Sequence, residues 1–270
     1  MPVQRRTARE LALKTLFQID VGRHPPSEAI EGALEQLRAP LLQAAAPHFA
    51  DASRQVADIV RRIHEPGTTR SGRQLRQAHQ SVLAELTAFR DALASAARRL
   101  LADRPDLTEP QAEDAVRQAL ARAAEGLKRV AERDAAFPEA RRLMASVAAS
   151  ACERAAESFL RQLPAAHRVA SFTVRLVRGT LEQQQEIDRR VAALSEGWSL
   201  DRQAAVDRNI LRLAAYELLF VPDIPVGASI NEAVELAKKY STAESGRFVN
   251  GVLGALAAQA SQASQAAKAG

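Results

Sequence analysis

The sequence has little cysteine and few aromatic residues: Cys152 is the single cysteine among 270 residues, and aromatic residues make up 4%. One cysteine excludes an internal disulfide and any multi-cysteine zinc site. No apolar run approaches the length of a bilayer span, and the N-terminus lacks the hydrophobic core of a signal peptide. We therefore expect a cytoplasmic protein. Alternating β-branched runs between turns are essentially absent, so the composition predicts an all-α fold.

Sequence signatures of enzymes are also missing. There is no GxxxxGK[ST] phosphate loop, no GxGxxG after a strand, no HExxH and no nucleophile elbow. The five histidines are scattered without carboxylates at metal-ligand spacing. We expect no catalytic residue, no metal and no cofactor, and the physically plausible activity is binding. A net charge of +5 with a pI near 9.8 is compatible with a nucleic-acid partner without being diagnostic of one.

The last quarter of the chain, residues 206–256, carries the most regular pattern. Its apolar residues recur at helical spacing in three stretches, and Pro222 and Pro225 bracket a turn between the first two. Ser229 with Glu232, and Ser241 with Glu244, fit the reciprocal capping pattern that opens a helix. The pattern predicts three short helices that form a compact subdomain.

Asn250 and Gly251 interrupt the last of these helices in a way that packing does not require. Glycine inside a helix costs about 1 kcal/mol relative to alanine, so it usually marks a close approach. Asn250 offers a donor pair and an acceptor beside the flat face of Phe248. Either these residues form a binding surface, or Asn250 bonds a neighbouring backbone group and Gly251 permits a tight helix crossing.

A basic cluster begins the chain. The spacing predicts a first helix over residues 7–21, with Arg5, Arg6 and Arg9 at or just before its start. Cations at a helix N-terminus oppose the helix dipole, which indicates an external anion. The alternative is a solvated basic end.

The region from residue 23 to 165 shows further helical stretches, at residues 27–37, 40–63, 74–102, 108–135 and 138–163. Breaks are expected at Pro66-Gly67, at residues 103–105 and at Phe137-Pro138, and Thr108 with Gln111 supplies a capping box. Its arginines alternate with acidic residues, which is typical of a solvated helix surface. The region predicts an Ala-rich helical bundle with its own core or an extended hairpin arm. Residues 259–270 are expected to be disordered.

Three blocks of the sequence together resemble the NusB family of bacterial transcription antitermination factors. The first, RRTARELA followed by LFQ, is similar to the family's opening helix, and the second runs from Phe172 through Gly179 and Ile187 to Trp198-Ser199-Leu200-Asp201-Arg202. The third is VDRNILRLAAYEL, a Pro-rich turn, INEAVELAKKY and FVNGVL. The blocks keep the family's order and cover about 110 of the 270 residues.

This resemblance implies a NusB-like helical bundle in residues 1–22 and 166–258, with residues 23–165 inserted after the first helix. It also implies binding of boxA-type single-stranded RNA together with the ribosomal protein NusE, in the transcription elongation complex, with read-through in ribosomal RNA operons. A homodimer is a further state that the resemblance allows. The RNA contacts carried over are Arg5, Arg6, Arg9, Phe17, Arg247, Phe248 and Asn250. The partner contacts are Asp207, Arg208 and Glu217.

These RNA contacts suit a single strand, because arginines neutralise phosphates, aromatic rings stack on bases and an amide can read a base edge. They require the two ends of the chain to fold side by side. Phe17 stands where the family often has tyrosine. A phenylalanine ring can still stack on a base, but it lacks the hydroxyl group and the contact that this group could make.

Two other functions remain open. A NusB-like domain of a ribosomal RNA cytosine methyltransferase would need a cofactor-binding domain with catalytic cysteines. A helical scaffold would use the insertion to dock a protein.

Overall fold

In the computed structural model the described residues are 2–63, 68–105, 107–133, 136–195 and 202–269. The expected break at Pro66-Gly67 and the block residues 198–201 lie outside them. Over the described part of the chain the structure contains helices and no strand, which confirms the prediction of an all-α fold. The helices are α1 (Pro2–Asp20), α2 (Pro26–Arg62), α3 (Arg70–Leu100), α4 (Glu109–Glu132), α5 (Pro138–Glu182), α6 (Gln184–Leu194), α7 (Ala205–Phe220), α8 (Val226–Tyr240) and α9 (Ala243–Ala269).

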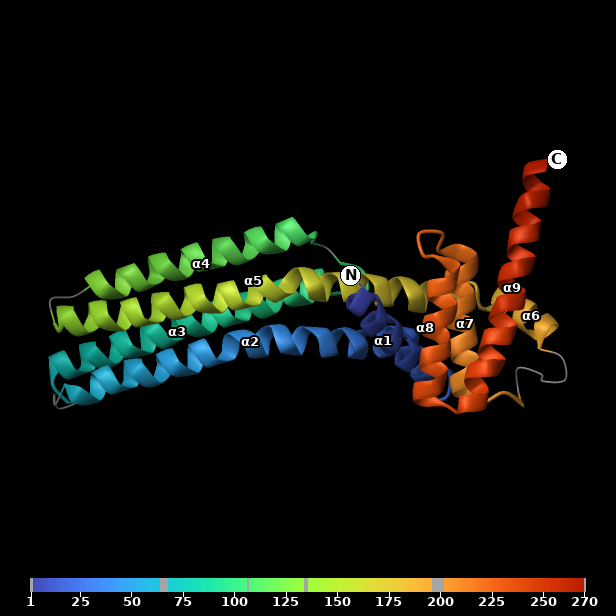
Figure 1. Ribbon diagram of the computed structural model, residues 1–270. Helices are drawn as coiled ribbons and strands as arrows, with labels where there is room; N and C mark the ends of the chain where they lie inside the picture. The colour runs from blue at the N-terminus through green and yellow to red at the C-terminus, as the bar shows by residue number, and fades with distance from the viewer. Residues whose placement is uncertain (1, 64–67, 106, 134–135, 196–201, 270) are drawn as a thin grey trace. The chain divides into compact units, whose positions relative to one another are not determined.

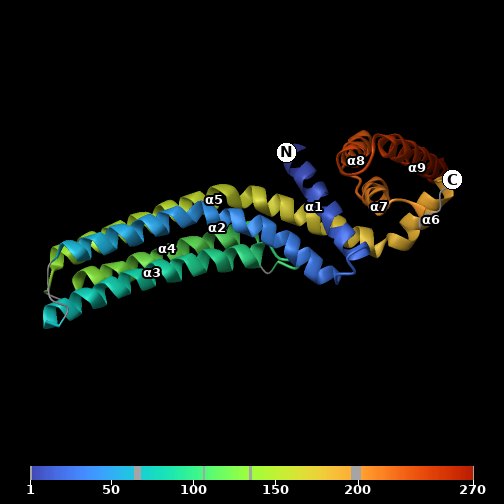
Figure 2. The ribbon, with the colours of Figure 1, turned by 90° about the horizontal axis from the view of Figure 1, so that it is seen from below.

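The chain forms two compact units. Unit 1 consists of Met1–Ala33 and Arg168–Gly270, and unit 2 consists of Leu34–His167. In unit 2, the segments of α2, α3, α4 and α5 run side by side in both views (Figures 1 and 2). In unit 1, α7, α8 and α9 lie next to one another with α1 close by (Figure 1).

Unit 2 has an apolar core of its own. Along α3 the fully buried residues recur three or four positions apart, so that one face of the helix is removed from water. Phe89 of that face packs edge-on against Phe49 of α2, with ring centroids 6.2 Å apart. The N-terminus of α4 has the expected capping contact, since the Gln111 side chain accepts a hydrogen bond from the Thr108 backbone N–H at 2.9 Å.

Two helices run through prolines at which the sequence predicted an end. Helix α2 is continuous past Pro40 and Pro47, and α5 is continuous past Pro164, so the predictions of separate helices at residues 27–37 and 40–63, and of an end at residue 163, were wrong. A proline removes one backbone hydrogen bond from a helix. Burial of apolar residues on either side of Pro40, such as Leu34 and Leu41, offsets that loss.

Helix α7 is the central helix of unit 1. Its residues from Asn209 to Glu217 are all buried, including faces that an amphipathic surface helix would expose. Helices α1, α6, α8 and α9 pack around it. Because α7 has no large solvent face, its polar side chains must find partners inside the unit.

The ends of three helices in unit 1 differ from the prediction. Helix α1 begins at Pro2, so its arginines lie within its first turns, and α8 begins directly after Pro225 rather than at Ser229. Thr242, not Ser241, caps α9, because its hydroxyl accepts a hydrogen bond from the Ser245 N–H at 3.1 Å. Helix α9 is drawn to Ala269, through the residues for which the sequence predicted disorder. Alanine has the highest helix propensity, which favours this extension.

Candidate nucleic-acid interface

Arg5 and Arg6 of α1 carry exposed guanidinium groups. Their side chains are 44% and 49% accessible. Each forms a loose ion pair, Arg5 with Asp223 at 3.6 Å and Arg6 with Glu232 at 3.8 Å. Exposed ion pairs of this kind contribute about 0–1 kcal/mol. Both positive charges can therefore be redirected to a phosphate at little cost.

Arg9, by contrast, is buried. Its Nε and Nη2 atoms donate to the two carboxylate oxygens of Glu217 at 2.7 and 2.9 Å, and Ser229 donates to the same carboxylate at 2.6 Å. The Arg9 and Glu217 side chains are only 6% and 1% accessible. The predicted RNA contact and the predicted partner contact thus bind each other, and they hold α1, α7 and α8 together.

Phe17 lies on the exposed side of α1, with 37% of its surface accessible. Lys14, three residues earlier on the same helix, places its Nζ 5.9 Å from the centre of the Tyr240 ring of α8, and Lys239 places its Nζ 5.1 Å from the same ring. Lys239 also donates to Glu10 at 2.8 Å. Burial opposes ionisation of Glu10, but the hydrogen bonds from Lys239 and Tyr240 outweigh it and lower the pKa of the Glu10 carboxyl.

Lys14, Lys239 and Tyr240 thus form a cationic and aromatic cluster across α1 and α8. None of these three residues was among the contacts predicted from the sequence. The sequence does show Lys239 directly before Tyr240, in INEAVELAKKY. Lys14 joins these two residues only through the contact between α1 and α8, which no local pattern indicates.

Helix α9 has one open face. Arg247, Asn250, Gly251 and Gly254 are all exposed, and they recur at a spacing of three or four residues. A Cβ atom added at Gly251 or Gly254 would meet no atom within 4 Å. The alternative that Gly251 permits a tight helix crossing within this chain is therefore not what the structure shows. The glycines leave bare backbone beside a guanidinium and an amide.

Phe248 lies at the edge of a cavity of about 300 Å³ between the starts of α7 and α9. Asp207 and Ser245 also line the cavity, and the Ser245 hydroxyl donates to Oδ2 of Asp207 at 2.7 Å. The other carboxylate oxygen, Oδ1 of Asp207, is buried without a hydrogen bond in the described structure. A buried oxygen without a hydrogen bond lowers the stability of the fold, so a hydrogen-bond donor from outside the chain would be favoured there.

Arg208, the third predicted partner contact, forms an ion pair within unit 1. Its guanidinium donates to Asp20 of α1 at 2.6 Å, and the Asn209 side chain donates to the same oxygen at 3.0 Å. Burial raises the pKa of Asp20, but the hydrogen bonds from Arg208 and Asn209 and the nearby Arg212 hold it below its ordinary value.

The two groups of predicted RNA contacts are separated by α8. Arg6 on α1 faces Glu232 of α8, whereas α9 approaches α8 near Val234 and Lys238, which lie next to Gly246. Both views show α8 between α1 and α9 (Figures 1 and 2). The expectation that the two ends lie directly side by side was wrong, because a complete helix fills the space between them.

A comparison with known proteins assigns the chain to a family. The NusB family model matches residues 117–258, just over half of the chain. The chain belongs to the NusB family. The matched range begins within α4 and contains α7, α8 and the first part of α9, up to residue 258, which is where the FVNG segment and the Asp207 cavity lie.

Individual NusB proteins are similar over shorter stretches. The transcription antitermination protein NusB of Desulfitobacterium hafniense is 56% identical over 82 residues, which is 30% of this chain and 55% of that protein. That of Desulfatibacillum aliphaticivorans is 46% identical over 99 residues, 37% of this chain and 69% of that protein. A solved structure of T. maritima NusB is 48% identical, with a TM-score of 0.32, and covers 33% of this chain and 63% of its own. This NusB-family chain spans about half the length of several of the curated relatives it matches.

A metal cluster and a membrane-spanning helix are both absent from the residues that the structure describes. Among the described residues, no group of three or more His, Cys, Asp or Glu side chains is placed to hold a metal ion. No helix in the same residues combines the length and apolar character needed to cross a membrane.

Proposed function

We propose that this NusB-family protein acts as a transcription antitermination factor that binds boxA-type single-stranded RNA together with the ribosomal protein NusE. The observation that carries the proposal is the open face of α9, where Arg247 and Asn250 flank the bare backbone of Gly251. Splayed bases of single-stranded RNA need such a surface, because they bond through their edges while arginines neutralise the phosphates.

The RNA strand would cross α8 to reach both groups of contacts. Arg5, Arg6 and Phe17 of α1 would bind one part, and Arg247, Phe248 and Asn250 of α9 would bind the other. The exposed Lys239 of α8 lies at the α1 side of this path and adds a positive charge. Phe17, 37% accessible, is suited to stack on a base without leaving its helix.

The partner protein would use the cavity beside Phe248. The buried Oδ1 of Asp207 lacks a hydrogen-bond donor in the described structure, and a basic ribosomal protein is rich in N–H donors. Arg9, Arg208 and Glu217 would support this interface indirectly, since each is already bonded within unit 1. They are positioning residues in this proposal.

RNA binding is tested by fluorescence anisotropy with a boxA-like RNA and a scrambled RNA of the same composition, with and without NusE. We expect tighter binding of the boxA-like RNA, most clearly with NusE present. R6A and R247A should each weaken binding and reduce the slope of log K against log salt by about 0.7 per lost phosphate contact.

The matched control is R54A, because Arg54 is an exposed arginine of unit 2 with 73% of its side chain accessible. It should leave affinity and salt slope unchanged. Equal affinity for boxA-like and scrambled RNA, or an equal effect of R54A, would contradict the proposal.

The domain division is part of the same proposal: residues 1–22 and 166–258 form the RNA-binding core, and residues 23–165 are inserted. Replacing residues 23–165 by a short linker should leave a helical protein that retains the preference for boxA-like RNA. A deletion protein that unfolds, judged by circular dichroism, would show that the core needs the insertion.

A further inference from the structure

Unit 2 contains a polar cavity, whereas the proposed RNA contacts all belong to unit 1. It has a volume of about 520 Å³ and lies between α3, the C-terminal part of α4 and the start of α5. Its wall combines three arginines, Arg129, Arg133 and Arg141, with amide and hydroxyl groups from α3. A cavity of this size falls in the range of small-molecule sites, about 300–1,000 Å³.

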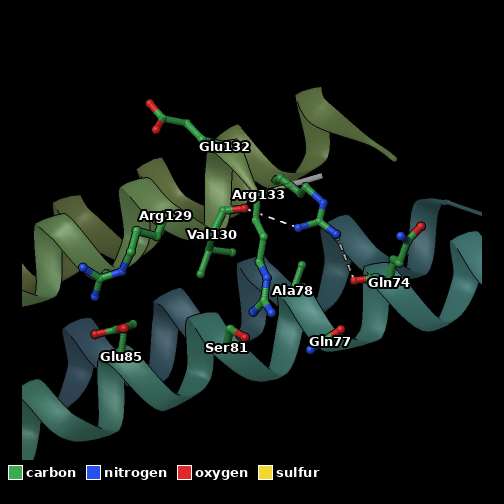
Figure 3. A pocket seen from close by; sticks show the side chains of 11 residues that line it. Gln74, Gln77, Ala78, Ser81, Glu85, Arg129, Val130, Glu132 and Arg133 are labelled. Atoms are coloured by element: carbon green, nitrogen blue, oxygen red, sulfur yellow. Dashed lines mark hydrogen bonds between the residues drawn. The ribbon is translucent and has the colours of Figure 1, made fainter. Parts of the chain in front are cut away.

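Arg141 forms the fixed part of the wall. It is 2% exposed, and its guanidinium donates to the backbone oxygens of Ala136 at 2.9 Å, Gln74 at 3.2 Å and Val130 at 3.4 Å. The dashed lines in Figure 3 are the bonds to Gln74 and Val130. Each of these carbonyl oxygens accepts a hydrogen bond from a guanidinium N–H group. These contacts come from three different parts of the unit, so the position of the guanidinium is set by the fold.

Arg129 and Arg133 are the other two cations of the cavity. Neither forms an ion pair within the described part of the chain, although Glu85 and Glu132 are nearby. Arg133 reaches across the cavity toward Ser81 and Gln77 of α3, whereas Glu132 points away from it (Figure 3). The helix dipole favours cations at the end of α4, but it does not account for a side chain directed into the cavity.

The opposite wall supplies neutral hydrogen-bonding groups. Gln74, Gln77 and Ser81 line it from α3, with Ala78 and Val130 as the apolar floor. The wall also holds Glu85, whose carboxylate fits against bare backbone: a Cβ atom at Gly126 would lie 2.1 Å from its Oε1. Amides, a hydroxyl and one acceptor facing two or three guanidinium groups suit a ligand with a phosphate at one end and a polar, hydrogen-bonding group at the other.

We propose that this cavity binds a phosphorylated small molecule of nucleotide size. The phosphates would bind Arg129 and Arg133 beside the fixed Arg141, and the α3 amides would bond the polar end. A nucleic-acid strand is a poorer fit, since the outer face of α4 carries self-neutralised charges, as in Arg117 with Glu113 at 3.2 Å. The site is independent of the proposed antitermination function.

The test is isothermal titration of the full-length protein with ATP, GTP and inorganic phosphate, followed by competition with a short single-stranded RNA. At least one nucleotide should bind about tenfold or more tightly than inorganic phosphate, since each additional tenfold requires only about 1.4 kcal/mol. R133Q should weaken that binding about tenfold, and R129Q should weaken it in the same direction. Hydrogen exchange should slow in residues 74–81 on binding.

The matched control is R117Q on the same helix, because Arg117 is 65% accessible and lies outside the cavity. It should leave nucleotide binding within about twofold of the unaltered protein, as expected of an exposed, locally paired charge. The proposal would be overturned if no nucleotide bound at millimolar concentration, or if R133Q and R117Q weakened nucleotide binding equally. It would also be overturned if R133Q weakened RNA binding more than nucleotide binding.

Discussion

The buried ion pair between Arg9 and Glu217 gives a prediction about stability. Both side chains are almost inaccessible, at 6% and 1%, and their two hydrogen bonds are short, at 2.7 and 2.9 Å. Removal of one partner leaves the other charge buried without compensation. R9M and E217M should therefore each destabilise unit 1 by about 3–5 kcal/mol, which is the usual cost of breaking a buried pair.

The double variant should be much less damaging than the two single variants together. In R9M/E217M no charge remains buried, and methionine fills a similar volume. The remaining cost is the Ser229 hydroxyl, which loses its acceptor Glu217 and is itself 2% exposed. An unsatisfied buried hydroxyl costs about 1–3 kcal/mol. The sum of the single effects is about 6–10 kcal/mol, so the coupling between the sites should exceed about 3 kcal/mol.

The measurement is chemical denaturation of the full-length variants, combined with hydrogen exchange of the α1 and α7 amides. Because the chain forms two compact units, denaturation need not be a single two-state transition, and the exchange data assign the loss to unit 1. R54A provides a control on an exposed arginine and should change stability by less than about 0.5 kcal/mol. Single variants that each cost under about 1 kcal/mol, or effects that add without coupling, would refute the reasoning.

Three further predictions concern other parts of the chain. G179A should destabilise unit 1 by about 1–3 kcal/mol in thermal unfolding, because its Cβ would lie 2.0 Å from the buried Tyr216 ring; no loss would show that the ring moves freely. The pKa of Asp20 is lowered from 3.8 in the folded protein. The Asp20 carboxylate should therefore contribute its full stabilisation above pH 3.8, and this contribution should disappear as the pH falls through the lower folded pKa. In denaturation curves measured over a pH series, D20N should lack this acid-dependent loss of stability. Burial, with Glu85 and Glu153 nearby, raises the pKa of Cys152 to about 12. An aromatic disulfide reagent should therefore leave Cys152 unmodified in the native protein and react with it after unfolding. Rapid reaction in the native protein would contradict the burial of this thiol.

The sequence predicted the helices where local signals agreed with tertiary packing. Helix α7, the Thr108 cap and the start of α5 at Pro138 follow directly from apolar spacing and capping residues. At Pro40 a local signal predicted a break, but the buried stripe that continues past it decides the outcome. Such long-range packing cannot be read from a window of neighbouring residues.

The candidate site shows the same limit. Arg247 and Asn250 were predicted as surface contacts, and both are exposed. Arg9 was predicted beside Arg5 and Arg6, because adjacent positions with the same charge look equivalent in a sequence. The difference arises from a carboxylate 208 residues away that happens to face only one of them. The separation of α1 from α9 by α8 is likewise a property of packing order, which no motif encodes.

The contact between Arg9 and Glu217 also has a consequence for the order of events during translation. At about 5–20 residues per second, the ribosome needs roughly 10–40 s to synthesise the 208 residues between these two partners. Unit 2 is one continuous segment, Leu34–His167, and can fold during that interval. The first helix must wait, with Ala8 and Leu11 unprotected, until the last quarter of the polypeptide emerges. A chaperone that shields nascent apolar helices would therefore act on this protein mainly at its N-terminus.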